Sequence, residues 1–264
     1  MYVIKGEILL KSPVITRYSF IPGTALRGVI LRSLTNIYNL ETAIKICENS
    51  IFRYSYPLCN CNSIAYPRST ILNNYFICEK CGSVIRIHYI NVKFGKALKP
   101  GQKFSLRIFT KYPKEMLEAI KLAEDLGLGA HKSCGLGKFH VKNLNVKKLE
   151  LISNKSDENS YLIRLLSPAV INKVPRRYSL SSFFKLFNLK AGKNSFYEIL
   201  KEREGNRINI SIYSQRLMRK IRLIVFDANS ILEVRGRFIK YLEKYYGLGH
   251  FIRAGFGEFR IMKD

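Results

Sequence analysis

Two stretches of the chain share one pattern of glycines: residues 127–139 read GLGAHKSCGLGKF, and residues 247–259 read GLGHFIRAGFGEF. Four glycines and a closing phenylalanine match at a constant separation of 120 residues, without a gap. Each stretch follows a helix-like segment and leads into a strand-like one. A repeat of this length is too long for a solenoid unit, and it predicts two related domains in tandem. We call the two stretches loop 1 and loop 2.

The glycines and the charge of the chain together indicate an anionic partner. Glycine lets the backbone adopt positive φ and approach a partner closely, and consecutive N–H groups in such a turn bind anions. The chain has 45 Lys and Arg against 19 Asp and Glu, a net charge of +26, which favours a polyanion such as nucleic acid. We therefore expect both loops to contact phosphates. The alternative is a pair of tight turns on a generally basic surface.

Composition limits the class of protein. The 264 residues have room for two domains of ordinary size, and a hydrophobic fraction of 47% is enough for packed cores. No apolar run reaches the roughly 18–20 residues of a membrane span, and the N-terminal residues lack the form of a secretory signal. We expect a cytoplasmic protein with no membrane partner.

The pattern of the first half of the sequence predicts the order strand, helix, strands, helix, strand. This order fits a ferredoxin-like βαββαβ layer. Thr24 is expected to cap the first helix, whose apolar face leaves Arg27 and Arg32 outside. The expected elements are strands over 2–10, 84–90, 103–109 and 136–146, an extended segment over 14–21, and helices over 25–38 and 114–126.

The second half repeats this plan less clearly. A polar stretch over 153–160 is expected to be a linker. The expected elements are strands over 161–166, 208–213 and 219–226, and helices over 180–187, 194–204 and 236–246. The predicted fold class is α+β, with two tandem ferredoxin-like domains over 1–152 and 161–264.

Four cysteines form two close pairs, a spacing that is typical of a zinc site. Tetrahedral structural zinc takes four thiolates, which the chain can supply from Cys59, Cys61, Cys78 and Cys81. We expect structural zinc, held in an insertion over about 57–82. The alternative is reduced thiols or a disulfide. Four cysteine ligands leave no open position, which argues against zinc catalysis. Cys47 and Cys134 lack close partners and are expected to be small buried residues.

The segment IPGTALRG at 21–28, opening a helix, resembles a signature of CRISPR-associated proteins of the RAMP superfamily. Both glycine loops resemble the glycine-rich loop of that superfamily. The resemblance implies RRM-like domains, with a zinc-knuckle insertion in the first and with the glycine loops lying against guide RNA.

Two such loops in tandem resemble the type III effector subunit that holds the 5′ handle of the guide RNA in an antiviral ribonucleoprotein complex. The implied partners are the guide (CRISPR) RNA, other RAMP subunits and the large polymerase-like subunit. The residues expected to bind RNA are Arg27, Arg32, Gly127, Gly129, His131, Lys132, Gly135, Gly137, Lys138, Gly247, Gly249, His250, Arg253, Gly255 and Gly257.

The sequence favours binding over catalysis but leaves both open. The superfamily's ribonucleases use an early Asp or a His near the first helix as general base, whereas here the first Asp is Asp125 and residues 24–38 contain no His. We assign no catalytic residue. The alternatives are a metal-independent endoribonuclease that processes precursor CRISPR RNA, and a single-stranded RNA-binding protein unrelated to CRISPR.

Overall fold

The computed structural model of the chain describes residues 1–16, 18–68, 74–149, 159–172, 174–189, 195–214 and 219–262. It divides into two compact units. Unit 1 comprises Met1–Leu149 and Arg253–Gly255, and unit 2 comprises Glu150–Ile252 and Phe256–Asp264. Most of the linker predicted over 153–160 lies outside the described residues.

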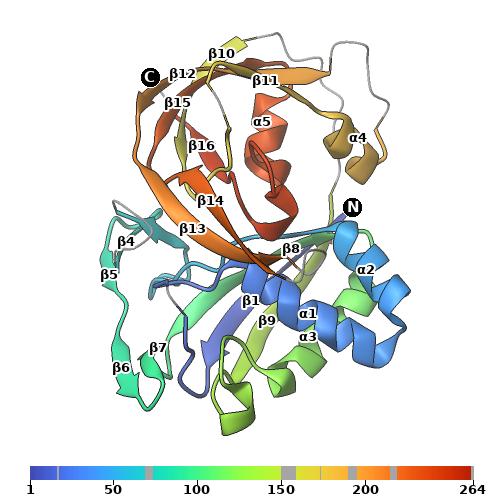
Figure 1. Cartoon of the computed structure of the whole chain (residues 1–264), viewed down its shortest axis with the longest axis vertical. Helices are drawn as coiled ribbons and strands as arrows, with labels where there is room; N and C mark the ends of the chain where they lie inside the picture. The colour runs from blue at the N-terminus through green and yellow to red at the C-terminus, as the bar shows by residue number, and fades with distance from the viewer. Residues whose placement is uncertain are drawn as a thin grey trace. The chain divides into compact units, whose positions relative to one another are not determined.

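Unit 1 is built on a four-stranded antiparallel sheet with the strand order β2-β8-β1-β9. Figure 1 labels β8, β1 and β9 of this sheet. Its strands are β1 (Tyr2–Leu10), β2 (Ser50–Phe52), β8 (Lys103–Thr110) and β9 (Phe139–Lys148). Ile4 pairs with Ile108 of β8, Ile8 pairs with Val141 of β9, and all four side chains are buried. The strands predicted over 2–10 and 103–109 are confirmed, and the one predicted over 136–146 begins three residues later.

Three helices accompany this sheet: α1 (Gly23–Ile37), α2 (Leu40–Glu48) and α3 (Pro113–Leu126). α1 and α3 pack against each other, and the predicted apolar face of α1 is buried except at its last residue, Ile37. Thr24 does not cap α1. The helix begins at Gly23, two residues before the predicted start, because the carbonyl of Pro22 accepts the first hydrogen bonds. The sequence did not predict α2, which Asn39 caps by accepting a hydrogen bond from the backbone N–H of Thr42 at 2.8 Å.

A long insertion separates β2 from β8. It forms a three-stranded sheet of β3 (Ala65–Pro67), β4 (Tyr75–Cys78) and β5 (Val84–Arg86), and a hairpin of β6 (Tyr89–Val92) and β7 (Gly95–Leu98). The single strand predicted over 84–90 is therefore wrong. The Gln102 side chain hydrogen-bonds the backbone N–H and carbonyl of His88, which occupies the break between β5 and β6.

Unit 2 contains a five-stranded antiparallel sheet with the order β11-β12-β15-β10-β16. Its strands are β10 (Asn159–Leu165), β11 (Arg176–Ser179), β12 (Phe196–Glu204), β15 (Ile231–Gly236) and β16 (Phe259–Ile261). Between β12 and β15 the chain forms a separate hairpin of β13 (Arg207–Ser214) and β14 (Arg219–Phe226). The strands predicted over 161–166, 208–213 and 219–226 are confirmed as β10, β13 and β14.

The helix predicted over 194–204 is wrong, because most of this segment forms β12. Its Glu, Lys and Leu residues favour a helix, but Tyr197 and Ile199 are buried at alternate positions, as a strand requires. Pairing with β11 and β15 on either side overrides the local propensity.

The helices of unit 2 pack against each other through aromatic side chains. α4 (Ser181–Phe187) is followed later in the chain by α5 (Ile239–Tyr241), which continues as a π-helix over Leu242–Tyr246. Phe183 of α4 meets Tyr246 edge to face at a ring distance of 5.4 Å. These helices match the predictions over 180–187 and 236–246.

The two central sheets share one topology. Apart from α2 and the insertion in unit 1, and from the edge strand β11 and the β13–β14 hairpin in unit 2, the chain passes through strand, helix, strand, strand, helix and strand in each unit. The first of these strands pairs with the third and the last. The protein is thus a mixed α/β protein with antiparallel sheets. Among the helices that the structure describes, none is long and apolar enough to cross a membrane.

Candidate nucleic-acid interface and metal centre

Each glycine loop joins the last helix of its unit to the last strand. All eight predicted loop glycines have positive φ, as the sequence indicates. Both loops contain a short 3₁₀ turn at the equivalent place, Lys132–Cys134 in loop 1 and Ile252–Ala254 in loop 2. The sequence repeat therefore corresponds to a repeat of backbone conformation.

The base of each loop is closed by the same two hydrogen bonds. In loop 1, Leu128 N–H donates to the carbonyl of Gly137 at 2.8 Å, and Gly137 N–H donates to the carbonyl of Pro13 at 2.8 Å. In loop 2, the corresponding bonds run from Leu248 to Gly257 and from Gly257 to Pro168, both at 2.8 Å. The segment after the first strand therefore anchors the loop in each unit.

A serine next to each of these prolines adds a third equivalent bond, which the sequence analysis missed. Lys138 N–H donates to the Ser12 hydroxyl, and Glu258 N–H donates to the Ser167 hydroxyl, both at 2.8 Å. The signal was present in the sequence. A Ser-Pro pair follows the first strand in each half of the chain, at 12–13 and at 167–168.

Above this shared base, the backbone amides of the two loops differ. In loop 2, Gly249 N–H donates to the Tyr197 hydroxyl at 2.7 Å, and His250 N–H donates to the Val170 carbonyl at 3.0 Å. Within the described part of the chain, no acceptor meets the corresponding N–H groups of Gly129 and Ala130 in loop 1, nor that of His131. Loop 1 therefore has unused N–H donors of the kind that bind anions. In loop 2 the corresponding N–H groups of Gly249 and His250 are already bonded within the protein.

Two cations lie close together at loop 1. Burial and the nearby charge of Arg32 both lower the pKa of Lys132. Neither side chain forms an ion pair with the residues that the structure describes. Lys138 is exposed at the end of the loop. An anion bound between Lys132 and Arg32 would relieve their repulsion.

Arg27 of α1 lies near Cys47 of α2. Burial raises the pKa of the Cys47 thiol to about 11, against the opposing influence of the Arg27 charge. Cys47 is buried, as the sequence predicts.

The two loop histidines occupy different surroundings. His131 is exposed, has a φ of 56°, and stacks on Phe94 with the ring centres 4.1 Å apart. His250 packs edge-on against Tyr178 at 5.5 Å, and its Nε2 is buried without a hydrogen-bond partner among the described residues. Burial, followed by the charge of Arg176, lowers the pKa of His250, which favours the neutral ring. His131 thus lies at the surface, whereas His250 packs into unit 2.

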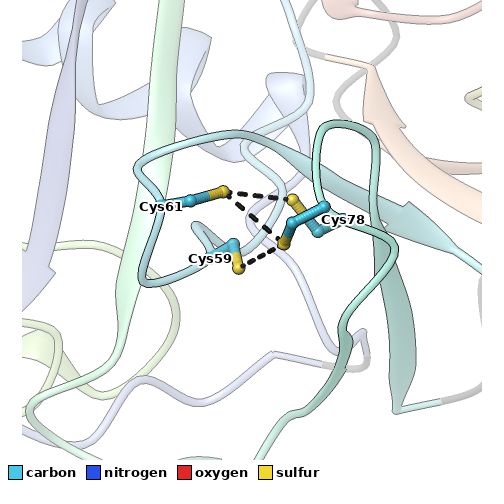
Figure 2. A group of neighbouring side chains, drawn as sticks. Cys59, Cys61 and Cys78 are labelled. Carbon is cyan, nitrogen blue, oxygen red and sulfur yellow. Dashed lines mark hydrogen bonds between the residues drawn. The ribbon is translucent and has the colours of Figure 1, made fainter.

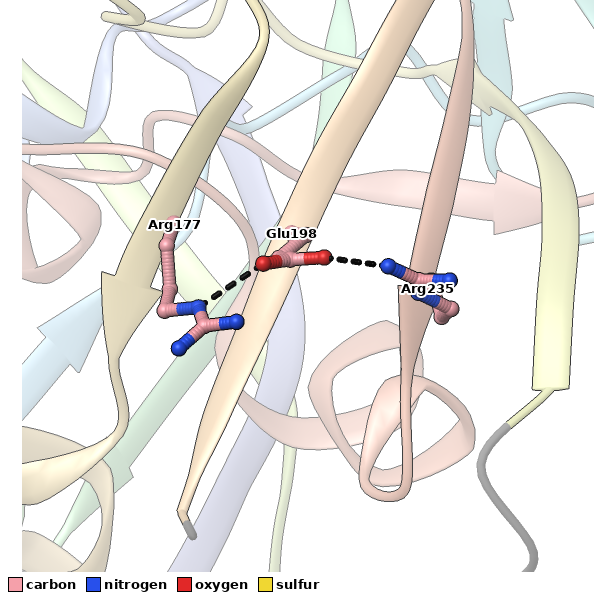
Figure 3. Close-up of polar contacts among 3 residues, drawn as sticks. All are labelled: Arg177, Glu198 and Arg235. Atoms are coloured by element: carbon pink, nitrogen blue, oxygen red, sulfur yellow. Dashed lines mark hydrogen bonds and ion pairs between the residues drawn. The ribbon is translucent and has the colours of Figure 1, made fainter.

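Loop 2 also differs in charge. Glu258 occupies the position that corresponds to Lys138 of loop 1, and Arg253 lies in the 3₁₀ turn. Two arginines of the unit 2 sheet, Arg177 and Arg235, are paired with an acid. Figure 3 shows Glu198 between Arg177 and Arg235, bonded to each at 2.7 Å across three neighbouring strands.

The hydrogen bonds from Arg235 and Arg177 lower the pKa of Glu198 and keep it ionised. The charges of these two arginines are therefore balanced by an acid, whereas those of Lys132 and Arg32 are not balanced by any described residue.

The four predicted cysteine ligands come together in unit 1. All four sulfurs lie within 4.8 Å of one another, and Figure 2 shows Cys59, Cys61 and Cys78 converging. The Sγ–Sγ distances are 3.4 Å from Cys61 to Cys78, 3.5 Å from Cys59 to Cys81 and 3.7 Å from Cys61 to Cys81. Tetrahedral zinc with Zn–S bonds of about 2.3 Å requires sulfurs about 3.8 Å apart, whereas a disulfide requires about 2.05 Å. The cluster fits a metal and does not fit a disulfide.

Two backbone turns present these sulfurs. Cys59 N–H donates to the Ser63 carbonyl and Cys78 N–H donates to the Ser83 carbonyl, each at 2.9 Å. Side-chain and backbone hydrogen bonds with Ser83 lower the pKa of Cys81 to about 6, which favours the thiolate that zinc binds. Cys134 is exposed in loop 1. The prediction that it is buried is therefore wrong, because the 3₁₀ turn places it at the surface.

No protein-family model and no curated protein matches the chain. Solved structures match the chain over nearly their whole length, among them three that are each 12% identical to it. One is described as a RAMP protein binding different RNA substrates, with a TM-score of 0.52 and 100% of each chain covered. Another is the product of a Cas6-related gene from Pyrococcus furiosus, with a TM-score of 0.51, covering 99% of this chain and 98% of that chain.

The third is Cas6 in a product complex, with a TM-score of 0.51, covering 98% of this chain and 99% of that chain. At this identity the likeness establishes the fold. The chain has the fold of RAMP and Cas6-related proteins, and the resemblance read from the sequence is confirmed at that level.

The closure of loop 1 can be tested at Gly137. Its φ is +85°, and a Cβ there would overlap the carbonyl oxygen of Leu128. We expect Gly137→Ala to lower the free energy of unfolding by about 2–3 kcal/mol, as measured by urea denaturation. Gly28→Ala is the matched control. Gly28 lies in α1 with open space around its Cα, and alanine there should stabilise the helix by about 0.5–1 kcal/mol. A Gly137→Ala protein as stable as wild type would contradict this account of the loop.

Proposed function

We propose that this RAMP-fold protein binds CRISPR guide RNA as a subunit of a type III effector complex and holds the 5′ handle of the guide at loop 1. One observation carries the proposal. The unused N–H groups of Gly129, Ala130 and His131 lie in the same loop as Lys132, which is next to Arg32. A phosphate accepts hydrogen bonds from backbone amides and neutralises cations at the same time. An RNA phosphate would therefore give the loop amides an acceptor and the two cations an anionic partner.

The charge of the chain and the solved structures support RNA as the ligand. A net charge of +26 favours binding to a polyanion. One of the structures that share the fold is that of a RAMP protein binding RNA substrates. On the unit 2 sheet, Arg177 and Arg235 are already paired with Glu198 and are less available to RNA. This favours a loop that contacts the RNA backbone as the binding site.

We propose two tandem RRM-like RAMP domains, over 1–152 and 161–264. The shared strand topology and the repeated loop-closing hydrogen bonds support this division. The two loops, however, have separate roles in the proposal. Loop 1 contacts the RNA phosphates, whereas the Gly249 and His250 amides of loop 2 are used inside the protein. The proposed partners, in the cytoplasm, are the guide RNA, other RAMP subunits and the large polymerase-like subunit.

We also propose a structural zinc held by Cys59, Cys61, Cys78 and Cys81 in a zinc-knuckle insertion. The spacing of the four sulfurs supports it. Four thiolates would fill a tetrahedral site. The metal would therefore stabilise the insertion and take no part in catalysis.

The zinc proposal predicts one zinc per chain in protein purified without a metal-affinity tag. Cys78→Ser should release the metal and loosen the insertion, because three thiolates bind zinc much more weakly than four. Cys134→Ser, which alters an exposed cysteine outside the cluster, should retain the full zinc content. Elemental analysis decides the question. A zinc content near zero in folded wild-type protein would refute the site.

The RNA proposal predicts that the purified protein binds single-stranded RNA with a steep salt dependence. The logarithm of the affinity should fall by about 0.7 per neutralised phosphate for each tenfold increase in salt. Lys132→Glu should weaken binding by about tenfold or more, because it places an anion against the phosphate. Fluorescence anisotropy over a range of salt concentrations measures both effects.

Lys240→Glu makes the same change of charge on the exposed surface of α5 and is the control. It should retain most of the affinity. If Lys240→Glu weakened binding as much as Lys132→Glu, the protein would bind RNA through its overall charge and loop 1 would not be the site.

A second candidate function is the processing of precursor CRISPR RNA, because the chain shares its fold with Cas6-related proteins along its whole length. We expect no cleavage of a labelled repeat RNA by the pure protein in the absence of metal. Of the two loop histidines, His131 is stacked on Phe94 and the Nε2 of His250 is buried. Site-specific cleavage that is lost in His131→Asn or His250→Asn would establish the processing role instead.

A further inference from the structure

The His131–Phe94 pair is an exposed aromatic stack beside the candidate phosphate site. The two rings are almost parallel, with an interplanar angle of 5° and a centroid distance of 4.1 Å. They come from separate elements, because Phe94 lies in the turn between β6 and β7 and His131 lies in loop 1. Phe94 is 42% exposed and His131 is also exposed. A stack of this kind, formed at the surface rather than in the core, leaves ring area open to a ligand.

The backbone at His131 indicates that the ring itself matters. His131 has a φ of 56°, a left-handed conformation that glycine and asparagine adopt more easily. The corresponding residue of loop 2 is Phe251, with a φ of 57° and 45% exposure. Each loop thus places an exposed ring at the same strained position, where glycine would cost less. Strain of this type concentrates at ligand sites.

The charges around the stack fit an RNA strand. Lys93 and Lys96 flank Phe94 and are both exposed, and Lys132 follows His131 directly. An aromatic ring among cations, next to free backbone amides, is the combination that binds single-stranded nucleic acid, because the base stacks while the cations hold the backbone.

We propose that His131 and Phe94 form a stacking platform for one unpaired base of the bound RNA, adjacent to the phosphate held by loop 1. This inference deepens the proposed function and rests on it. The platform accepts any of the four bases, since every base has a π-face. Phe94 supports the His131 ring from behind and holds it in the orientation that the base requires.

Two substitutions separate the ring from the backbone conformation. His131→Asn removes the ring and retains a residue that tolerates positive φ. His131→Phe restores an aromatic ring, and Phe251 shows that phenylalanine adopts this conformation. We expect His131→Asn and Phe94→Leu each to weaken binding of a single-stranded repeat RNA by about tenfold, and we expect His131→Phe to recover the affinity. Tyr75→Leu alters another exposed aromatic residue of unit 1 and is the control.

An RNA series with a single abasic nucleotide at each position in turn completes the test. One abasic position should weaken binding to wild type by about the same factor as His131→Asn, and should weaken binding to His131→Asn no further, because the two changes remove one contact. If wild type and His131→Asn bind every RNA equally well, the platform is refuted and the proposed function stands. If wild type binds no RNA at all, both are refuted.

Discussion

The closure of the glycine loops against the Ser-Pro segments is the constraint on which the rest of the structure depends. In each unit the Ser-Pro pair after the first strand accepts two hydrogen bonds from the loop that precedes the last strand. These hydrogen bonds hold the start of the last strand against the end of the first strand in each unit. They therefore fix where the last strand enters the sheet. They also require glycine at 137 and 257, where any side chain would overlap the opposite backbone. The same closure in both units explains why glycine recurs at these two equivalent positions.

With the base of each loop fixed, its outer half is free to differ. In unit 2 the Tyr197 hydroxyl and the Val170 carbonyl occupy the loop amides, and His250 packs against Tyr178. In unit 1 the equivalent amides remain without acceptors among the described residues, and the surrounding side chains are cationic or aromatic. The sequence repeat thus indicates a shared structural role, and the proposed binding role belongs to the loop whose donors are unused. Asymmetry of this kind suits a subunit that must hold one end of one RNA.

The sequence predicted the elements whose signal is local. The apolar periodicity of α1, the alternation of β1 and β8, and the positive φ of the loop glycines all follow from their own residues. The cysteine spacing likewise predicted the cluster. What it missed depends on distant partners: β12 is a strand because β11 and β15 flank it, and the Phe94–His131 stack joins two segments that are far apart in the chain. His131 and His250 both lie in glycine loops, at positions that differ by one residue when the loops are aligned. Their packing shows that His131 is exposed and that the Nε2 of His250 is buried.

The most direct test of the central claim is to map where RNA lies on the protein, by ultraviolet crosslinking of a repeat-derived single-stranded RNA followed by mass spectrometry of the peptides. The account predicts crosslinks in peptides that contain Phe94 and His131, because photo-crosslinking favours aromatic rings stacked on bases. Crosslinks confined to the sheet of unit 2, around Arg177 and Arg235, would contradict it and would place the RNA on the surface whose arginines are already paired with Glu198.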